Sequence, residues 1–389
     1  MTQTSEKTSV FFLLILSALM AVTSLSTDIY LPAMPDMAKE LQGDAELTVT
    51  GFLIGFAVAQ LIWGPISDQV GRKKPLFIGM VLFVIGSIGC AYSTTMPQIM
   101  FWRVFQAFGA CTAPMLSRAM IRDLFSRARA AQMLSTLTII MAIAPIIGPL
   151  LGGQIIVFST WHSIFILLAV IGVVLFGLIF FLPETHREEN RTQVSIGSAF
   201  KNYAFLLTHK TFMKYTLCVT FYYVSAYAFI TGSPAVYISY FGIEPQHYGW
   251  LFAINIIGVM SMSFVNRKLV HRFPLQSLLK VATIIAATAT VIMAIAVEAD
   301  FYSLVAIISM VFIYFSMNGI VAAVSTAAAL DEVPQIAGSA SALIGSLQYG
   351  SGIISTILLA IFSTGTPSAM VVIMALFTVL SMLIARKAA

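Results

Sequence analysis

The chain has 389 residues, of which 59% are hydrophobic and only 10% are charged. Soluble domains carry about 25% charged residues, so this composition excludes a soluble globular protein. The formal net charge is +5, but it does not indicate nucleic-acid binding, because the basic residues lie in small clusters between apolar segments.

Apolar segments of roughly 20 residues follow one another along the chain, and each is long enough to cross about 30 Å of hydrocarbon. Backbone polar groups in lipid must bond internally, and the segments lack the period-2 alternation of a membrane barrel, so we expect helices. Breaks in the hydropathy predict twelve spans, at residues 9–37, 47–67, 75–93, 97–120, 130–155, 160–181, 213–240, 247–266, 276–297, 301–328, 335–361 and 367–385.

Basic residues cluster at alternate ends of the spans, and acidic residues predominate at the opposite ends. Cytoplasmic loops are enriched in Lys and Arg, so the basic ends and both termini are expected in the cytoplasm. A signal peptide at the start is rejected, because its removal would reverse this agreement in every later loop. The basic clusters lie at 72–74, 118–129, 187–214, 267–272 and 386–387, and the acidic connections include Asp36, Glu40, Asp44, Glu46, Glu244, Glu298 and Asp300.

A polar stretch that opens with PETHREENRTQ separates six spans from six. Pro32 in DIYLPAMP aligns with Pro234 in ITGSPAVY, and Asp123 in RDLFSRARAAQ aligns with Asp331 in LDEVPQIAGSA. These matches predict an all-α integral membrane protein with two pseudo-symmetric six-helix bundles, and rocking such halves opens a central cavity to each side in turn. The expected domains are an N-terminal bundle at 1–182, a cytoplasmic linker at 183–212 and a C-terminal bundle at 213–389.

Asp28 and Arg103 lie deep within their spans, about 13 Å and about 9 Å from the periplasmic ends. Burial of an unpaired charge is costly, so Arg103 is expected to face the cavity and to bond carboxylates, carbonyls or ligand. Snorkelling to the headgroups is the alternative. Arg103 favours the ionised form of Asp28 and desolvation favours the protonated form, so the pKa of Asp28 can change as the cavity closes. The alternative for Asp28 is a solvated position at the interface.

The connection after the second span reads GPISDQVGRKKPL. Gly64 is expected to let neighbouring helices approach, and Gly71 suits a tight turn. Asp68 at a helix C-terminus needs a partner. Arg72 is suited to a forked contact with a carboxylate, for which Asp123 is the candidate. We expect these residues to form a conformational latch.

This connection resembles the G-x-x-x-D-(R)-x-G-R-(K/R) signature of the major facilitator superfamily, with Gln69 in place of the usual arginine. FWRVFQAFGA in the fourth span resembles the family's R-x-x-Q-G-type motif, although Gly109 stands three residues after Gln106. The run from Asp28 to Pro32 resembles the D-x-Y-L-P element of Bcr/CflA drug:proton antiporters. APIIGPLLGG in the fifth span resembles the G-P-x-x-G-G element of exporters. The resemblance covers most of the chain.

The fifth span is expected to bend and to act as a hinge or seal. Proline breaks backbone hydrogen bonds, and glycine lets another helix come close. Ordinary packing of small residues is the alternative. The residues concerned are Pro145, Gly148, Pro149, Gly152 and Gly153.

Polar aromatic and amide side chains within the spans are candidates for substrate contacts. Rings with hydroxyl groups suit planar, moderately polar ligands, whereas amides either line a cavity or link helices. Tyr237 and Tyr240 are expected in an interfacial belt. Cys90, Cys111 and Cys218 are expected to be packing residues. The predicted substrate-cavity residues are Tyr30, Gln106, Tyr223, Tyr227, Asn255 and Gln348.

The chain lacks a nucleotide-binding loop, a metal-ligand spacing and a nucleophile motif, so neither an enzyme, a cofactor nor a metal is expected. The resemblance implies a monomeric antiporter of the bacterial inner membrane that exchanges protons for drug-like molecules such as bicyclomycin, phenicols or sulphonamides. In the expected cycle Asp28 carries the proton and Arg103 tunes Asp28 and orients the substrate. A proton-coupled exporter or importer of a small metabolite on the same fold is the alternative.

Overall fold

The computed structural model describes residues 2–186, 188–190 and 196–388, and in these ranges the chain is helical, without strands. The predicted all-α class is therefore confirmed. The first half comprises α1 (Thr2–Asp28), η1 (Leu31–Ala33), α2 (Met34–Leu41), α3 (Glu46–Val70), α4 (Lys73–Ala91), α5 (Met96–Ala110), α6 (Thr112–Leu124), α7 (Arg127–Phe158) and α8 (Trp161–Ile179).

The remaining elements begin with η2 (Glu188–Asn190) and α9 (Ile196–Thr208), which lie in the stretch predicted to link the halves. The second half comprises α10 (Lys210–Pro234), η3 (Ala235–Tyr240), α11 (Pro245–Leu269), α12 (Leu275–Glu298), α13 (Leu304–Asp331), η4 (Pro334–Ile336), α14 (Ala337–Phe362) and α15 (Ser368–Ala388).

Ten segments of the described chain are long and apolar enough to cross a membrane. The two other predicted spans coincide with α5 and α6, which meet at Cys111, and with α10, which is rich in tyrosine and threonine. Every predicted span therefore corresponds to a helical segment. The ends agree within a few residues, except that α1 begins at Thr2, well before the predicted start at residue 9. The twelve-span architecture is confirmed.

The first predicted span is not one continuous helix. α1 ends at Asp28, and the chain continues through the 3-10 helix η1, which contains Pro32, into α2. The first span of the second half changes at the aligned position, since α10 ends at Pro234 and continues as the π-helix η3. Proline cannot donate a backbone hydrogen bond, so the proline at each of these positions explains why the regular α-helix ends there. The matching breaks support the alignment of the two halves.

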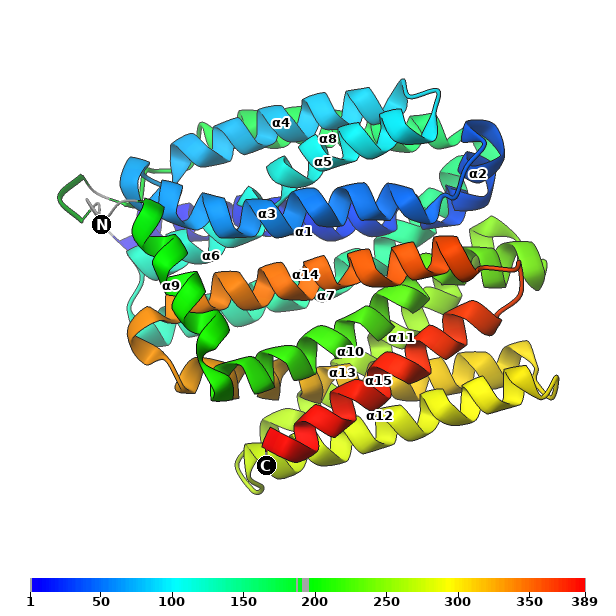
Figure 1. Cartoon of the computed structure of the whole chain (residues 1–389). Coiled ribbons are helices and arrows are strands. Elements are labelled where there is room, and N and C mark those ends of the chain that lie inside the picture. The colour runs from blue at the N-terminus through cyan, green and yellow to red at the C-terminus, as the bar shows by residue number, and fades with distance from the viewer. Residues whose placement is uncertain (1, 187, 191–195, 389) are drawn as a thin grey trace.

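The helices of each half pack mainly on one another, and the halves lie side by side (Figure 1). Most of the contact between the halves comes from two helix pairs: α3 packs against α14, and α7 packs against α11. Each pair unites one helix from each half. Exchange of the halves turns one pair into the other, as expected for a pseudo-two-fold axis.

The charged connections define two ends of the molecule. We call the end with the connection between α3 and α4, which carries Arg72, Lys73 and Lys74, the basic end. The end with α2 and the connection between α10 and α11, which carry Asp36 and Glu244, is the acidic end. α1 begins and α15 ends at the basic end (Figure 1).

Helix α9 was not predicted, because its polar surroundings suggested a plain linker. The hydroxyl of Tyr203 donates to the carbonyl oxygen of Leu61 on α3 at 3.0 Å, and Asn202 donates to the hydroxyl of Ser339 on α14 at 3.3 Å. Burial raises the pKa of Tyr203 to about 12, so its hydroxyl remains a donor at neutral pH. α9 therefore ties the two halves together at the basic end.

Candidate functional site

Arg103 lies on α5 with no exposed surface. Its Nη1 donates to the carbonyl oxygen of Ser26 at 2.9 Å and to Oε1 of Gln106 at 2.5 Å. Nε donates to the carbonyl oxygen of Thr48 at 3.4 Å. The alternative that Arg103 snorkels to the headgroups is wrong, because carbonyl dipoles within the first half hold the side chain inside the bundle.

Aromatic rings complete the surroundings of Arg103. Its guanidinium carbon lies 4.5 Å from the ring centroids of both Tyr30 and Phe52, and 5.8 Å from that of Phe165. The negative faces of such rings stabilise a cation that has left water. Nη2 of Arg103 is buried and has no hydrogen-bond partner among the described residues, so one strong donor is still available.

Asp28 is the last residue of α1, and only 6% of its surface is exposed. The alternative of a solvated Asp28 is therefore wrong. Arg103 acts on Asp28 electrostatically, yet none of the ion pairs between described residues joins them. Asp28 also interacts electrostatically with Tyr227, Tyr248 and Tyr349. These tyrosines belong to the second half, so the carboxyl group lies where the two halves meet.

The fifth span touches Asp28 through its glycines. A Cβ atom added at Gly148 would lie 3.4 Å from Cβ of Asp28, and one added at Gly152 would overlap the carbonyl oxygen of Ile29. α7 therefore crosses the end of α1 at a distance that only glycine permits at position 152.

The same segment of α7 also meets the second half. A Cβ atom at Gly153 would lie 2.6 Å from the carbonyl oxygen of Pro245 on α11, and one at Gly249 would lie 2.7 Å from the backbone nitrogen of Leu150. Pro145 and Pro149 lie inside the continuous helix α7. The backbones of α7 and α11 are thus in close contact at the acidic end, beside Asp28.

A cluster of aromatic rings lies between α3, α10 and α14. The ring centroids of Phe56 and Tyr349 are 4.0 Å apart, and the ring of Tyr227 lies 6.4 Å from Tyr349. The ring of Tyr223 lies 6.3 Å from Tyr227. Two predicted substrate residues, Tyr223 and Tyr227, are therefore together, and Tyr349 joins them although sequence reasoning missed it.

The four other predicted substrate residues are Tyr30, Gln106, Asn255 and Gln348. Tyr30 and Gln106 are fully buried against Arg103. Asn255 donates to the carbonyl oxygen of Leu251 on its own helix at 3.3 Å, and its Oδ1 has no partner among the described residues. Gln348 lies half-buried on α14.

The interfacial belt was predicted correctly for only one of its two tyrosines. Tyr240 is 43% exposed at the acidic end, but Tyr237 is only 1% exposed. Tyr237 is buried because the π-helical turn directs its ring toward Phe229 and Tyr248, with centroids 5.9 and 6.2 Å away. The three cysteines are buried and free, in agreement with the prediction that they are packing residues.

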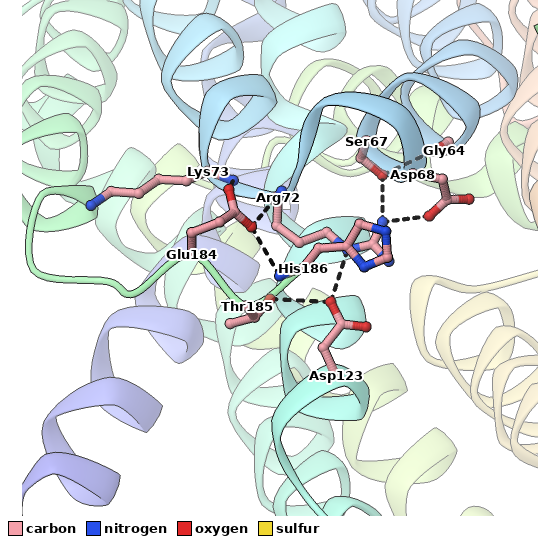
Figure 2. A network of polar contacts seen from close by, with 9 residues as sticks. All are labelled: Gly64, Ser67, Asp68, Arg72, Lys73, Asp123, Glu184, Thr185 and His186. Carbon is pink, nitrogen blue, oxygen red and sulfur yellow. Dashed lines mark hydrogen bonds and ion pairs between the residues drawn. The ribbon is translucent and has the colours of Figure 1, made fainter. Parts of the chain in front are cut away.

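Figure 2 shows Arg72 at the basic end with Gly64, Asp68 and Asp123, which also belong to the predicted latch. Nη1 of Arg72 lies 2.5 Å from Oδ1 of Asp68, and Nε lies 2.9 Å from Oδ2 of Asp123. The predicted contact between Arg72 and Asp123 is present, and Asp68 finds its partner in the same arginine. Gly71 has a φ of 97°, which favours glycine and supports the predicted tight turn.

Two neighbours of Arg72 come from the start of the linker, where no motif pointed to them. Glu184 accepts the backbone N–H groups of Arg72 at 2.9 Å and of Lys73 at 3.1 Å (Figure 2). Thr185 donates to Oδ2 of Asp123 at 3.1 Å. A carboxylate is stabilised at a helix N-terminus by the free N–H groups and the dipole, so Glu184 anchors the linker to α4.

The expected role of Gly64 is wrong in this structure. A Cβ atom at Gly64 would meet no atom within 4 Å, so the residue does not allow a close helix approach. Gly64 instead borders a cavity of about 730 Å³ between the halves at the basic end. The wall of this cavity comes from α3, α6, α7, α9, α13 and α14, together with η4 and Arg72. None of the six predicted substrate residues lines it.

Two related helical bundles that touch at one end and enclose a cavity at the other define a multi-pass membrane protein of the transporter class. The sequence profile of the Major Facilitator Superfamily matches residues 16–356. The chain belongs to this family.

Curated relatives of similar length agree with the family. The chain is 36% identical to the uncharacterized MFS-type transporter YdgK of Bacillus subtilis, over 92% of this chain and 90% of that protein. It is 30% identical to the bicyclomycin resistance protein homolog of Haemophilus influenzae, over 97% and 96%. It is 26% identical to multidrug resistance protein D of Escherichia coli, over 92% and 91%.

Solved structures share the fold at low sequence identity. The nucleoside transporter NupG superimposes with a TM-score of 0.77 at 13% identity, covering 97% of this chain and 98% of that one. At this identity the match shows the fold alone. It confirms the predicted arrangement of two six-helix bundles.

Proposed function

We propose that this protein exports drug-like small molecules from bacterial cells and that protons moving inward drive the export. The names of two relatives, a bicyclomycin resistance protein homolog and a multidrug resistance protein, support this class of substrate. The central observation is the position of Asp28. It is a buried carboxyl group between Arg103 on one side and tyrosines of the second half on the other.

The charge distribution supports an orientation with the basic end in the cytoplasm of the inner membrane. The cavity at the basic end then faces inward, and the contact of α7 with α11 closes the outer side. In this orientation the cavity receives substrate from the cytoplasm.

In the proposed cycle substrate binds while Asp28 is ionised, and the outward-open state exchanges the substrate for a periplasmic proton. Burial opposes a charge on Asp28 and the positive charge of Arg103 favours it, so small movements of α1 against α5 alter the balance. Gly148 lies against Asp28 and Gly153 lies against α11. Protonation at Asp28 is therefore positioned to act on the contact between the halves.

Proton coupling is tested with Asp28→Asn in everted membrane vesicles that carry an imposed pH gradient. We expect the variant to lose uphill accumulation of bicyclomycin or a phenicol while it still exchanges substrate down a concentration gradient, which shows that it is folded. Asp36→Asn changes an exposed acid at the same end and serves as the control. Normal uphill accumulation by Asp28→Asn would refute the assignment, and accumulation in right-side-out vesicles instead would indicate an importer.

A further inference from the structure

The cavity at the basic end carries a net positive charge. Its charged lining residues are Asp68, Arg72, Arg118 and Arg122. Arg72 is neutralised by its ion pairs with Asp68 and with Asp123 just outside the wall. Arg118 and Arg122 therefore supply the excess positive charge of the cavity, which the half-exposed Asp68 offsets only in part.

Arg118 and Arg122 stand one helical turn apart on α6, and neither belongs to an ion pair between described residues. Nε of Arg118 donates at 3.0 Å to the carbonyl oxygen of Pro114 on its own helix, which supplies no counter-charge. Like charges four residues apart repel each other. Both arginine side chains are exposed and line the cavity, so they are accessible to a ligand. An anion bound between the two guanidinium groups relieves their repulsion.

The rest of the wall suits an organic molecule rather than a simple ion. A volume of about 730 Å³ lies within the range of drug-sized ligands. Met115 and Leu116 offer apolar surface, and Gln60, Asn202 and Gln335 offer hydrogen-bonding groups. An apolar body that carries one acidic oxygen group matches this combination.

We propose that the cavity binds organic anions, in particular apolar compounds that carry a carboxylate, with Arg118 as the principal partner and Arg122 as the second. The proposal rests on the proposed export function and names the substrate class that the inward-facing cavity selects. Asp28 is absent from the described lining of the cavity, so the anion site at Arg118 is separate from the proposed proton site.

The test uses three probes with one ring system and different charge: naphthoate, naphthamide and naphthylmethylammonium. Their binding to the purified full-length protein in neutral detergent is measured by isothermal titration calorimetry. We expect naphthoate to bind about tenfold more tightly than the other two, as one charge-assisted hydrogen bond predicts. The preference should shrink when salt is raised from about 0.1 M to about 1 M, because the cavity is open to solvent ions.

Single substitutions test which arginine causes the preference for naphthoate. Arg118→Gln should lower naphthoate affinity about tenfold and leave naphthamide binding unchanged. Arg118→Lys should bind naphthoate more tightly than Arg118→Gln but less tightly than the parent protein. Lysine keeps the positive charge but lacks the planar pair of donors of the guanidinium group. Arg122→Gln should have a smaller effect in the same direction. Arg267→Gln removes an exposed charge at the basic end outside the cavity and is the matched control. Melting temperatures show that each variant is folded.

Equal affinities for the three probes, or an unchanged preference in Arg118→Gln, would overturn the proposal. So would Arg118-dependent binding of phosphatidylglycerol in nanodiscs without naphthoate binding, because the arginines would then hold a lipid headgroup. The titrations need no proton gradient, so their outcome is independent of the vesicle experiment on Asp28. Loss of the anion preference would leave proton-driven export of neutral compounds intact.

Discussion

The two buried arginines of the first half, Arg72 and Arg103, are stabilised in different ways. Carboxylates surround Arg72, and these belong to the ends of separate helices. Arg103 is held by carbonyl oxygens and aromatic rings of a single bundle. Movement of helix ends breaks the first set of contacts but leaves the second intact. Arg72 is therefore suited to a conformational latch, whereas Arg103 is suited to a fixed positive charge beside the proposed proton site at Asp28.

Replacement of Arg72 by Gln should weaken the latch, because Asp123 loses its cation in a partly buried position. The side chain of Asp123 is 19% exposed and that of Asp68 is 52% exposed, so most of the effect comes from Asp123. We expect a loss of about 1–2 kcal/mol in stability and a lower melting temperature in detergent. Lys74→Gln, at an exposed position in the same connection, should change little. A melting temperature for Arg72→Gln equal to that of Lys74→Gln would contradict the role of the ion pair.

At the scale of elements, α7 connects Asp28, the proposed proton site, to the contact between the halves. Its glycines lie within about one and a half turns of helix, and they allow close contacts with different helices. Gly152 permits contact with α1 in the same half, whereas Gly153 permits contact with α11 in the other half. Prolines 145 and 149 each leave a carbonyl oxygen of the helix without its usual partner, which makes bending easier. A change in the charge or position of Asp28 therefore acts on the contact between α7 and α11 through a single helix, α7.

Gly153→Ala should open the acidic end. The new methyl group would lie 2.6 Å from the carbonyl oxygen of Pro245, and backbone atoms must move to accommodate it. The distance between spin labels on Asp36→Cys and His247→Cys, both at the acidic end, is measured by pulsed electron paramagnetic resonance. In Gly153→Ala a larger fraction of molecules should have a long distance between the two labels. The label sites are exposed, and the native cysteines are buried.

The matched control is Gly177→Ala on α8, where a Cβ atom meets nothing within 4 Å. Its distance distribution should equal that of the parent protein. If Gly153→Ala also leaves the distribution unchanged, α7 and α11 do not form the seal.

At the scale of the whole molecule, the interface between the halves is closed at the acidic end and opens toward the basic end. Along α3 and α14 the contact runs from the hydrogen bond between Thr50 and Thr356 to the close approach of Gln60 and Gly345. Gln60 already borders the cavity. α9 crosses the interface beyond this point. The structure is therefore one of two expected states, with its acidic end closed.

A disulfide across the closed end should stop transport. The hydroxyl oxygens of Thr50 and Thr356 are 2.6 Å apart, so cysteines at both positions are close enough to form a bond. We expect the oxidised double variant Thr50→Cys/Thr356→Cys to lose substrate exchange and to regain it after reduction. Each single variant should exchange substrate with or without oxidant. Exchange at the parent rate by a fully cross-linked sample would show that this contact does not open.

The sequence by itself determined the spans, their order and the charge asymmetry of their ends. These properties are local, because a segment long and apolar enough must cross the membrane as a helix. The contact of Arg72 with Asp123 was also predictable, since a carboxylate and a guanidinium follow adjacent helix ends. The positive φ of Gly71 was predictable for the same local reason.

Only the tertiary structure decided which helix faces meet. Apolar residues cover all sides of a helix in lipid, so hydropathy shows no stripe that points to the partner helix. Sequence reasoning therefore missed Tyr349 at the aromatic cluster, Glu184 at the start of α4 and Arg118 in the cavity wall. It also placed Gly64 in a close helix contact that is not there. For Tyr349, Arg118 and Gly64 the error concerns the rotation of a helix about its own axis, which packing against the other helices fixes and composition does not. Glu184 lies in the linker, and only the path of the linker brings it to the start of α4.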